Sequence, residues 1–208
     1  MRNEQGTRSS LVSSRLVRPL SNPLVHVLAF TTIAVWIIGE IRQSQNRRED
    51  ATASDRGSRT VLGVTRVFGA VLAIVFYRQT GAARIGPALT VGRVALVCLW
   101  CGIALRFWSF RTLGRYFTFT VQTSEDQPVI DSGPYKVIRH PSYAGALLAI
   151  AGVALLFGNW WSFAGLMVPV VAGFVYRIVV EERALKRALG ERYVDYARTH
   201  KRLIPFLW

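Results

Sequence analysis

Residues 143–180 read YAGALLAIAGVALLFGNWWSFAGLMVPVVAGFVYRIVV, and this stretch decides the fold. It contains two apolar runs, about Tyr143–Phe157 and Trp160–Val180, which are separated by only two residues. A helix needs ~20 mostly apolar residues to cross the hydrocarbon core of a bilayer. The second run reaches that length and the first approaches it. Because so short a connection allows only a tight turn, the stretch predicts two membrane helices that pack as an antiparallel hairpin.

Three further apolar runs lie upstream of this hairpin. They cover about Leu24–Gly39, Val61–Tyr77 and Leu89–Phe110. Hydrophobic residues make up 51% of the 208 residues, which is a high share for a soluble domain. The sequence therefore predicts an all-α fold, a polytopic membrane helical bundle of about five transmembrane helices. The first run and the run that follows Tyr143 are short, so we expect both helices to extend into flanking residues.

The polar segments divide the chain into three parts. Residues 1–20 are expected to form a flexible basic tail, residues 21–110 the N-terminal transmembrane helices, and residues 111–208 the region that carries the chemistry. The connection 111–142 is too long for a simple turn and contains aromatic residues, so we expect it to fold back on the protein. After the last span the sequence becomes an amphipathic tail, in which Gly190 is expected to divide two short helices.

The net charge is strongly positive, with 26 Lys and Arg against 12 Asp and Glu. These charges lie mainly in the tails and connections, and no nucleic-acid-binding module is recognisable, so they favour membrane lipids as partners over DNA or RNA. With five spans, residues 40–60, 111–142 and 181–208 share one side and hold most of the Lys and Arg, which predicts a cytoplasmic face. The basic N-terminal tail then lies on the other side, against this rule. A cytoplasmic tail would instead require an interfacial first run, or four or six spans.

Two cysteines, Cys98 and Cys101, have the spacing of a redox pair or of half a zinc site. They lie inside an apolar run, and no second pair of Cys or His residues is near them in the sequence. We interpret them as side chains of a membrane helix and expect no metal site.

Residues 131–145, DSGPYKVIRHPSYAG, form the first candidate functional segment, at the predicted boundary between water and membrane. Gly133 and Pro134 favour a turn, and Pro141 suits the first turn of a helix, where its missing N–H is not needed. The free N–H groups of a helix N-terminus can hold a carboxylate. The alternative interpretation is a membrane-interface loop followed by a helix that begins at proline.

The second candidate segment lies at the end of the last span and contains Arg177, Glu181 and Glu182. Arg177 and Glu181 share a helix face. Acidic residues at a helix C-terminus oppose the helix dipole, so they indicate a partner or a ligand. The alternative is a solvated cluster with an internal Arg–Glu pair. An antiparallel hairpin would place this segment near His140 and Tyr143, in a polar and aromatic cluster typical of a binding site.

Together, the run Arg139–Gly145 and the acidic pair at 181–182, joined by an apolar hairpin, resemble the isoprenylcysteine carboxyl methyltransferase family and the related phospholipid methyltransferases. Downstream, Leu189–Tyr196 and Arg202–Pro205 also match the family's pattern. The resemblance covers about residues 111–208. It implies an integral membrane enzyme that transfers a methyl group from S-adenosylmethionine to a lipophilic acceptor, such as the carboxylate of a prenylated cysteine or a similar lipid.

The resemblance also implies the residues of the site. Catalytic roles fall on Arg177, Glu181 and His140, with Arg177 directed toward the acceptor. The charge of a sulfonium donor can be stabilised by a carboxylate and by aromatic faces. A carboxylate acceptor needs no strong base, whereas an amine or phenol would need His140 or Glu182 as the base. The implied donor-binding residues are Gln127, Pro128, Val129, Ile130, Tyr135, His140, Pro141, Ser142, Tyr143, Glu181 and Glu182, and position 127 departs from the His expected in some relatives.

Two other functions remain open. Membrane reductases of the steroid-reductase type have a similar hairpin and use NADPH. Their version of the motif has an acid soon after the tyrosine, where this chain has Ala144–Ala146. A non-catalytic membrane protein on the same scaffold would keep Arg177 and Glu181 as a structural pair. The sequence predicts neither the identity of the acceptor nor the oligomeric state.

Overall fold

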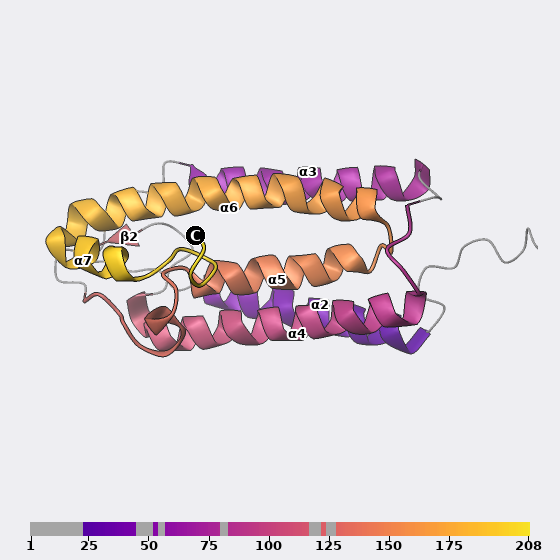
Figure 1. The fold of residues 1–208 in the computed structure, drawn as a ribbon, viewed down its shortest axis with the longest axis horizontal. Coiled ribbons are helices and arrows are strands. Elements are labelled where there is room, and N and C mark those ends of the chain that lie inside the picture. Colours follow the sequence, from indigo (N-terminus) through magenta and orange to yellow (C-terminus); the bar gives the residue numbers. More distant parts are fainter. Residues whose placement is uncertain (1–22, 45–51, 54–56, 80–82, 117–121, 124–127) are drawn as a thin grey trace, which may run out of the picture.

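The computed structural model describes residues 23–44, 52–53, 57–79, 83–116, 122–123 and 128–208. Their apolar helices form an elongated bundle, and a short polar helix follows them (Figure 1). The helices are α2 (Pro23–Ser44), α3 (Ser58–Gln79), α4 (Ala88–Leu113), α5 (Pro141–Leu155), α6 (Trp160–Leu189) and α7 (Glu191–Thr199). The shorter elements are β1 (Thr52–Ala53), which pairs antiparallel with β2 (Gln122–Thr123), and the 3-10 turns η1 (Gly114–Tyr116) and η2 (Gly133–Lys136).

Four of these helices, α2, α3, α4 and α6, are long and apolar enough to cross a membrane. The expected extension of the first apolar run is confirmed, since α2 has 22 residues. The expected extension of the fourth run is wrong, because α5 has only 15 residues. That is a length of about 22 Å, against ~30 Å for the hydrocarbon core. Pro141 fixes the start of α5, since a residue before proline is disfavoured in a helix and His140 has an extended φ of −123°.

Helix α6 is longer than its apolar run predicts. It continues without a break to Leu189, past the expected end at Val180, so Glu181 and Glu182 lie inside a helix and not at its end. The division at Gly190 is confirmed, because Gly190 has a positive φ of 57° and separates α6 from α7. The expectation of two short helices is wrong on the α6 side, since backbone hydrogen bonding does not stop where the side chains become charged.

The packing differs from a simple hairpin. α5 and α6 are antiparallel, as expected, but α5 packs mainly on α4, and α6 packs mainly on α3 (Figure 1). Small residues allow these close approaches. A Cβ atom at Gly145 of α5 would lie 2.7 Å from the carbonyl oxygen of Gly102 in α4, and one at Gly69 of α3 would lie 2.8 Å from the carbonyl oxygen of Leu166 in α6. The bundle therefore consists of two tight helix pairs, with α2 beside α4.

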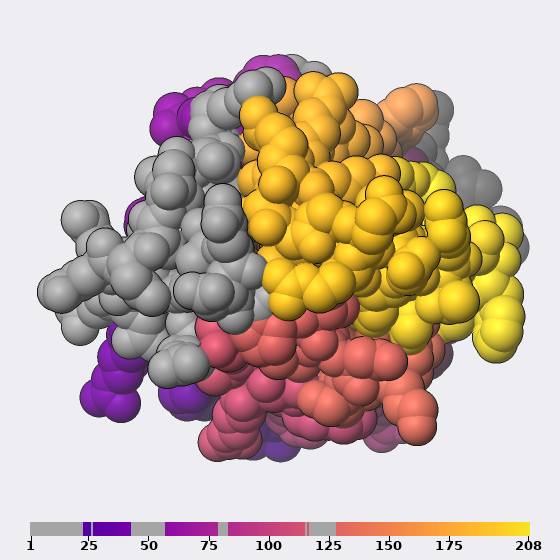
Figure 2. All heavy atoms as spheres, turned by 90° about the vertical axis from the view of Figure 1, so that its left-hand side faces the viewer, coloured from indigo at the N-terminus to yellow at the C-terminus, as the bar shows by residue number. Residues whose placement is uncertain are grey.

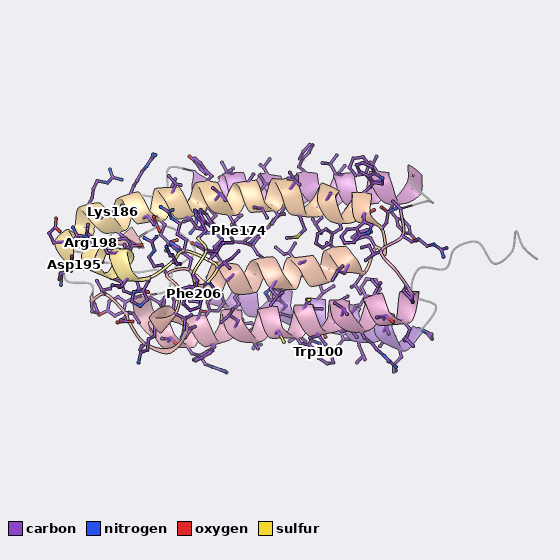
Figure 3. The ribbon with its side chains drawn as sticks, viewed as in Figure 1. Trp100, Phe174, Lys186, Asp195, Arg198 and Phe206 are labelled. Atoms are coloured by element: carbon purple, nitrogen blue, oxygen red, sulfur yellow. The ribbon has the colours of Figure 1, made fainter. Side chains whose placement is uncertain are left out.

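Side chains of α3, α5 and α6 form the main buried core. It includes Tyr143, Ile150, Val170, Phe174 and Ile178, among others. Phe174 lies between α6 and α5, whereas Trp100 of α4 points away from the bundle (Figure 3). Exposed apolar side chains of this kind on a helix that spans a membrane are suited to contact with lipid.

The end of the connection between α4 and α5 folds back on the protein, as expected. η2 contacts α4, and Ile138 forms a parallel bridge with Lys201 in the segment after α7. The backbone N–H groups of Arg139 and His140 donate to the carbonyl oxygens of Lys201 and Arg202, at 2.8 and 3.0 Å. The end-on view shows the α6–α7 region directly against the region of α4 (Figure 2). The segment that leads into α5 is therefore held by the C-terminal part of the chain.

Candidate active site

Polar side chains gather where the start of α5 meets the last membrane turns of α6 and the start of α3. His140 and Tyr143 are both buried, and their rings stack with centroids 5.5 Å apart and planes 8° apart. Pro141 and Ser142 are also buried at this point. The aromatic surface and the first turn of α5 thus form one wall of the candidate site.

The hydroxyl of Tyr143 joins the two helices of the hairpin. It donates to Oε2 of Glu181 at 2.5 Å and accepts from Nε of Arg177 at 2.9 Å. Arg177 also donates to Oγ of Ser58, the first residue of α3, at 2.9 Å. The expected proximity of the two candidate segments is confirmed. Glu181 and Arg177 share a helix face, but the tyrosine hydroxyl lies between their charges.

Glu182 lies in a different environment from Glu181. Its side chain is 5% exposed and pairs with Arg139 at 3.0 Å and with Arg202 at 3.0 Å. Nε2 of His140 is 3.3 Å from the same carboxylate, while Nδ1 of His140 is 3.9 Å from Oε2 of Glu181. His140 therefore stands between the two acids, and Glu182 ties it to the C-terminal segment.

Arg106 of α4 anchors the first turn of α5. Its guanidinium is buried, pairs with the carboxylate of Glu40 in α2, and donates from one nitrogen to the carbonyl oxygen and to Oγ of Ser142, at 3.0 Å each. Sequence reasoning missed Glu40 and Ser58 as neighbours of the site. The one signal for Glu40 is an acidic residue beside an apolar run, since intramembrane charges usually have partners.

The expected donor-binding residues of the α4–α5 connection are only partly placed near this cluster. Gln127 lies outside the described residues. Pro128, Val129 and Ile130 make no hydrogen bond or ion pair with the cluster within the described part of the chain. Tyr135 is buried, and burial, followed by the nearby Glu181 carboxylate, raises the pKa of its hydroxyl well above the ordinary value. Tyr135 is thus the member of this group that lies in electrostatic reach of Glu181.

Tyr196 of α7 holds this connection in place. Its hydroxyl donates to the carbonyl oxygen of Tyr135 at 2.6 Å. Burial raises the pKa of Tyr196 above its ordinary value, so the hydroxyl keeps its proton at neutral pH. Asp131 lies 3.4 Å from Nε2 of His200 at the same place. These contacts hold η2 and Asp131, just before it, against the C-terminal part of the chain.

The region that holds most of this cluster also matches a known family. Residues 91–192 match the family model described as phospholipid methyltransferase. Through this region the chain is similar to the phospholipid methyltransferase family. The matched region contains Arg106, His140, Tyr143, Arg177 and both acids. The family favours a methyltransferase over the reductase that the hairpin alone left open.

Relatives in other organisms match a little more than half of the chain. Protein-S-isoprenylcysteine O-methyltransferase B of Arabidopsis thaliana is 32% identical over 119 residues, which are 56% of this chain and 60% of that protein. Protein-S-isoprenylcysteine O-methyltransferase of Xenopus laevis is 30% identical over 116 residues, 55% of this chain and 40% of that protein. The chain thus spans less than two thirds of the length of these relatives.

A solved structure shares the fold. It is that of the eukaryotic intramembrane Ras methyltransferase, isoprenylcysteine carboxyl methyltransferase, with a TM-score of 0.53 and 22% sequence identity. The likeness covers 88% of this chain and 63% of that one. The helical membrane fold therefore extends to helices upstream of the family match.

Proposed function

We propose that this chain is an S-adenosylmethionine-dependent methyltransferase of the membrane, which methylates the carboxylate of a lipophilic acceptor. One observation carries the proposal: a carboxylate, a stacked aromatic pair and an arginine meet where α5 and α6 meet, within the family region. The Tyr143 hydroxyl joins Glu181 and Arg177 across that junction. The cluster offers one group for a cation and one for an anion.

The residues present fit the methyl donor. S-adenosylmethionine supplies, when bound, an electrophilic methyl group on a positively charged sulfur. Glu181 suits that charge, because its side chain is 28% exposed and its hydrogen bond comes from a neutral hydroxyl. Glu182 suits it less, since two arginines already compensate its charge. His140 and Tyr143 add flat faces beside Glu181. In this proposal Glu181 contacts the donor, and Glu182 positions His140.

The acceptor follows from the names of the relatives and from Arg177. The relatives are isoprenylcysteine O-methyltransferases, so a prenylated cysteine carboxylate is the first candidate. A carboxylate is already a nucleophile and needs no base. Arg177 can hold and orient it through its guanidinium, because a guanidinium matches the geometry of a carboxylate. Positioning of this kind supplies much of the rate of a displacement reaction.

The same end of the bundle is proposed to face the cytoplasm. Three connections that carry most of the Lys and Arg leave from it, and such segments are typically cytoplasmic. A lipid acceptor would then enter from the bilayer beside α5 and α6.

The test uses the full chain in lipid nanodiscs, with radiolabelled S-adenosylmethionine and N-acetyl-S-farnesylcysteine. We expect a methyl ester that releases labelled methanol in base, and no such product with phosphatidylethanolamine, whose amine would give a base-stable product. Saturable binding of NADPH but not of S-adenosylmethionine would overturn the proposal.

The role of Glu181 is tested separately. Glu181→Gln keeps the shape of the side chain and removes the charge, so we expect donor affinity to fall about tenfold or more, as for the loss of a contact to a charged group. The matched control is Glu191→Gln, an exposed acid in the first turn of α7. Unchanged donor affinity in the Glu181 variant would remove it from the donor site.

A further inference from the structure

A third arginine, Arg66, lies inside the bundle near this site. It occupies the third turn of α3, eight residues after Ser58, which places it about 12 Å along the membrane helix. Its guanidinium lies over the ring of Phe174, with its carbon 5.4 Å from the ring centroid. Phe174 is fully buried and lies between α6 and α5 (Figure 3). Arg66 thus points into the bundle and not toward lipid.

Arg66 has no anionic partner among the residues that the structure describes. Its Nε is buried without a hydrogen-bond partner, and no ion pair is formed by its other nitrogens in the described ranges. The nearest acid in electrostatic reach is Glu40, whose two oxygens are engaged by Arg106. A charged side chain in a membrane helix is costly unless it is paired, so such a residue points to a function.

The surroundings of Arg66 connect it to the acceptor side of the site. Arg66 and Tyr143 both contact Phe174, since the rings of Tyr143 and Phe174 have centroids 5.4 Å apart. Arg177 holds the hydroxyl of that same tyrosine. Arg66 is also within electrostatic reach of Arg177 and Arg106. A positive charge that lies close to other positive charges attracts an anion.

We propose that Arg66 is a second arginine that binds the carboxylate of the methyl acceptor, together with Arg177. The inference rests on the proposed methyltransferase function and adds α3 to the site, outside the family region of residues 91–192. A cationic donor would add positive charge near Arg66, and an anionic acceptor would offset that charge. Arg66 therefore makes a charged acceptor preferable to a neutral one of the same shape.

The test measures this preference directly. The probes are N-acetyl-S-farnesylcysteine and its carboxamide, which have nearly the same shape but differ in charge. Their binding to the full chain in nanodiscs is measured by calorimetry in the presence of the demethylated donor. We expect the wild type to bind the acid at least ~10-fold more tightly, as for a charge-assisted hydrogen bond. In Arg66→Met we expect the two affinities to agree within about threefold, and in Arg66→Lys an intermediate preference, because lysine keeps the charge without the planar fork.

Controls separate this proposal from the proposed function. Arg93→Met removes an exposed arginine near the other end of α4 and should leave the acid preference unchanged. Donor affinity should stay within about twofold in all variants, since Arg66 is assigned to the acceptor. If the wild-type protein binds no donor, the proposed methyltransferase function itself is contradicted.

Three outcomes overturn the role of Arg66 alone. One is a wild type that binds donor but does not prefer the acid. The second is an acid preference that persists in Arg66→Met. The third is loss of donor affinity or of thermal stability in Arg66→Met together with an unchanged acid preference in Arg66→Lys. This third result would mean that the charge at position 66 does not act through the acceptor carboxylate as proposed.

Discussion

Glu181 and Glu182 are neighbours in the chain but belong to two different clusters. Glu181 faces the start of α5, where the hydroxyl of Tyr143 donates to it and Nδ1 of His140 lies 3.9 Å away. Glu182 faces the C-terminal segment, and two arginines and His140 surround it. The first cluster contains a partly exposed carboxylate held by a neutral donor, whereas the second contains a buried carboxylate whose charge is compensated.

The difference separates binding from positioning. A buried carboxylate with all its partners in place contributes to structure, because a ligand would have to displace those partners. A carboxylate with one neutral donor can still compensate a new positive charge. We therefore assign ligand contact to the Glu181 cluster, and to the Glu182 cluster the task of fastening the first turn of α5 to the end of the chain.

The largest effect is expected from Glu182→Ala. It leaves Arg139, whose side chain is only 9% exposed, without its anion, and breaking one side of a buried ion pair typically costs about 3–5 kcal/mol. The free energy of unfolding from denaturant titration in mixed micelles measures this loss. Asp195→Ala is the control, since Asp195 and Arg198 form an exposed pair and such pairs contribute about 0–1 kcal/mol. Equal losses of unfolding free energy in the two variants would mean that Glu182 contributes no more to stability than an exposed pair does, and would contradict the structural role of its cluster.

A smaller loss, mainly in activity, is expected from Tyr143→Phe. The variant keeps the ring that stacks on His140 but removes the hydroxyl between Glu181 and Arg177. Hydrogen bonds to charged groups contribute about 1.5–3 kcal/mol, so kcat/KM should fall roughly 10- to 100-fold. Tyr77→Phe, in which the edge contact with Phe157 remains, should be close to wild type. If the free energy of unfolding falls by as many kcal/mol as the loss of kcat/KM corresponds to, Tyr143 has a structural role like that of the Glu182 cluster.

The smallest effect is expected from Tyr196→Phe. This variant loses one hydrogen bond between neutral groups, from the hydroxyl to the carbonyl oxygen of Tyr135. The expected cost is about 1 kcal/mol of stability, together with a donor affinity that falls less than tenfold. Thermal unfolding and donor titration on the same sample measure both. If donor affinity falls further in Tyr196→Phe than in Glu181→Gln, the contact between Tyr196 and Tyr135 contributes to donor binding.

Much of the fold follows from patterns that are local in the sequence. Apolar runs predict the helices, and the two-residue break at 158–159 predicts the antiparallel turn. That turn alone brings His140 and Tyr143 to Arg177, because equal distances from a turn become neighbours in a hairpin. The acids at 181–182 lie about one turn further along α6, where their long side chains still reach Tyr143 and His140.

The remaining features depend on contacts that no local pattern encodes. The apolar run ends at Val180, but the helix continues to Leu189 because its backbone hydrogen bonds also form in water. Short loops predict which helices are adjacent, but they do not predict which two helices pack most closely. Glycines such as Gly102 determine that, because they allow two backbones to approach. Glu40 and Ser58 reach the site from helices without a motif, so their roles depend on tertiary packing.

The two tight helix pairs have a mechanical consequence. Glycine contacts lock α4 to α5 and α3 to α6, whereas α5 and α6 share fewer contacts and are joined by the turn at 156–159. The side chain of Asn159 caps α6 there, and its backbone forms an antiparallel bridge with Arg84 in the connection between α3 and α4. The seam between α5 and α6 is therefore where the two tight pairs can separate with little loss of packing, with the turn at its far end as the hinge. In the proposed function, a lipid tail would enter along this seam.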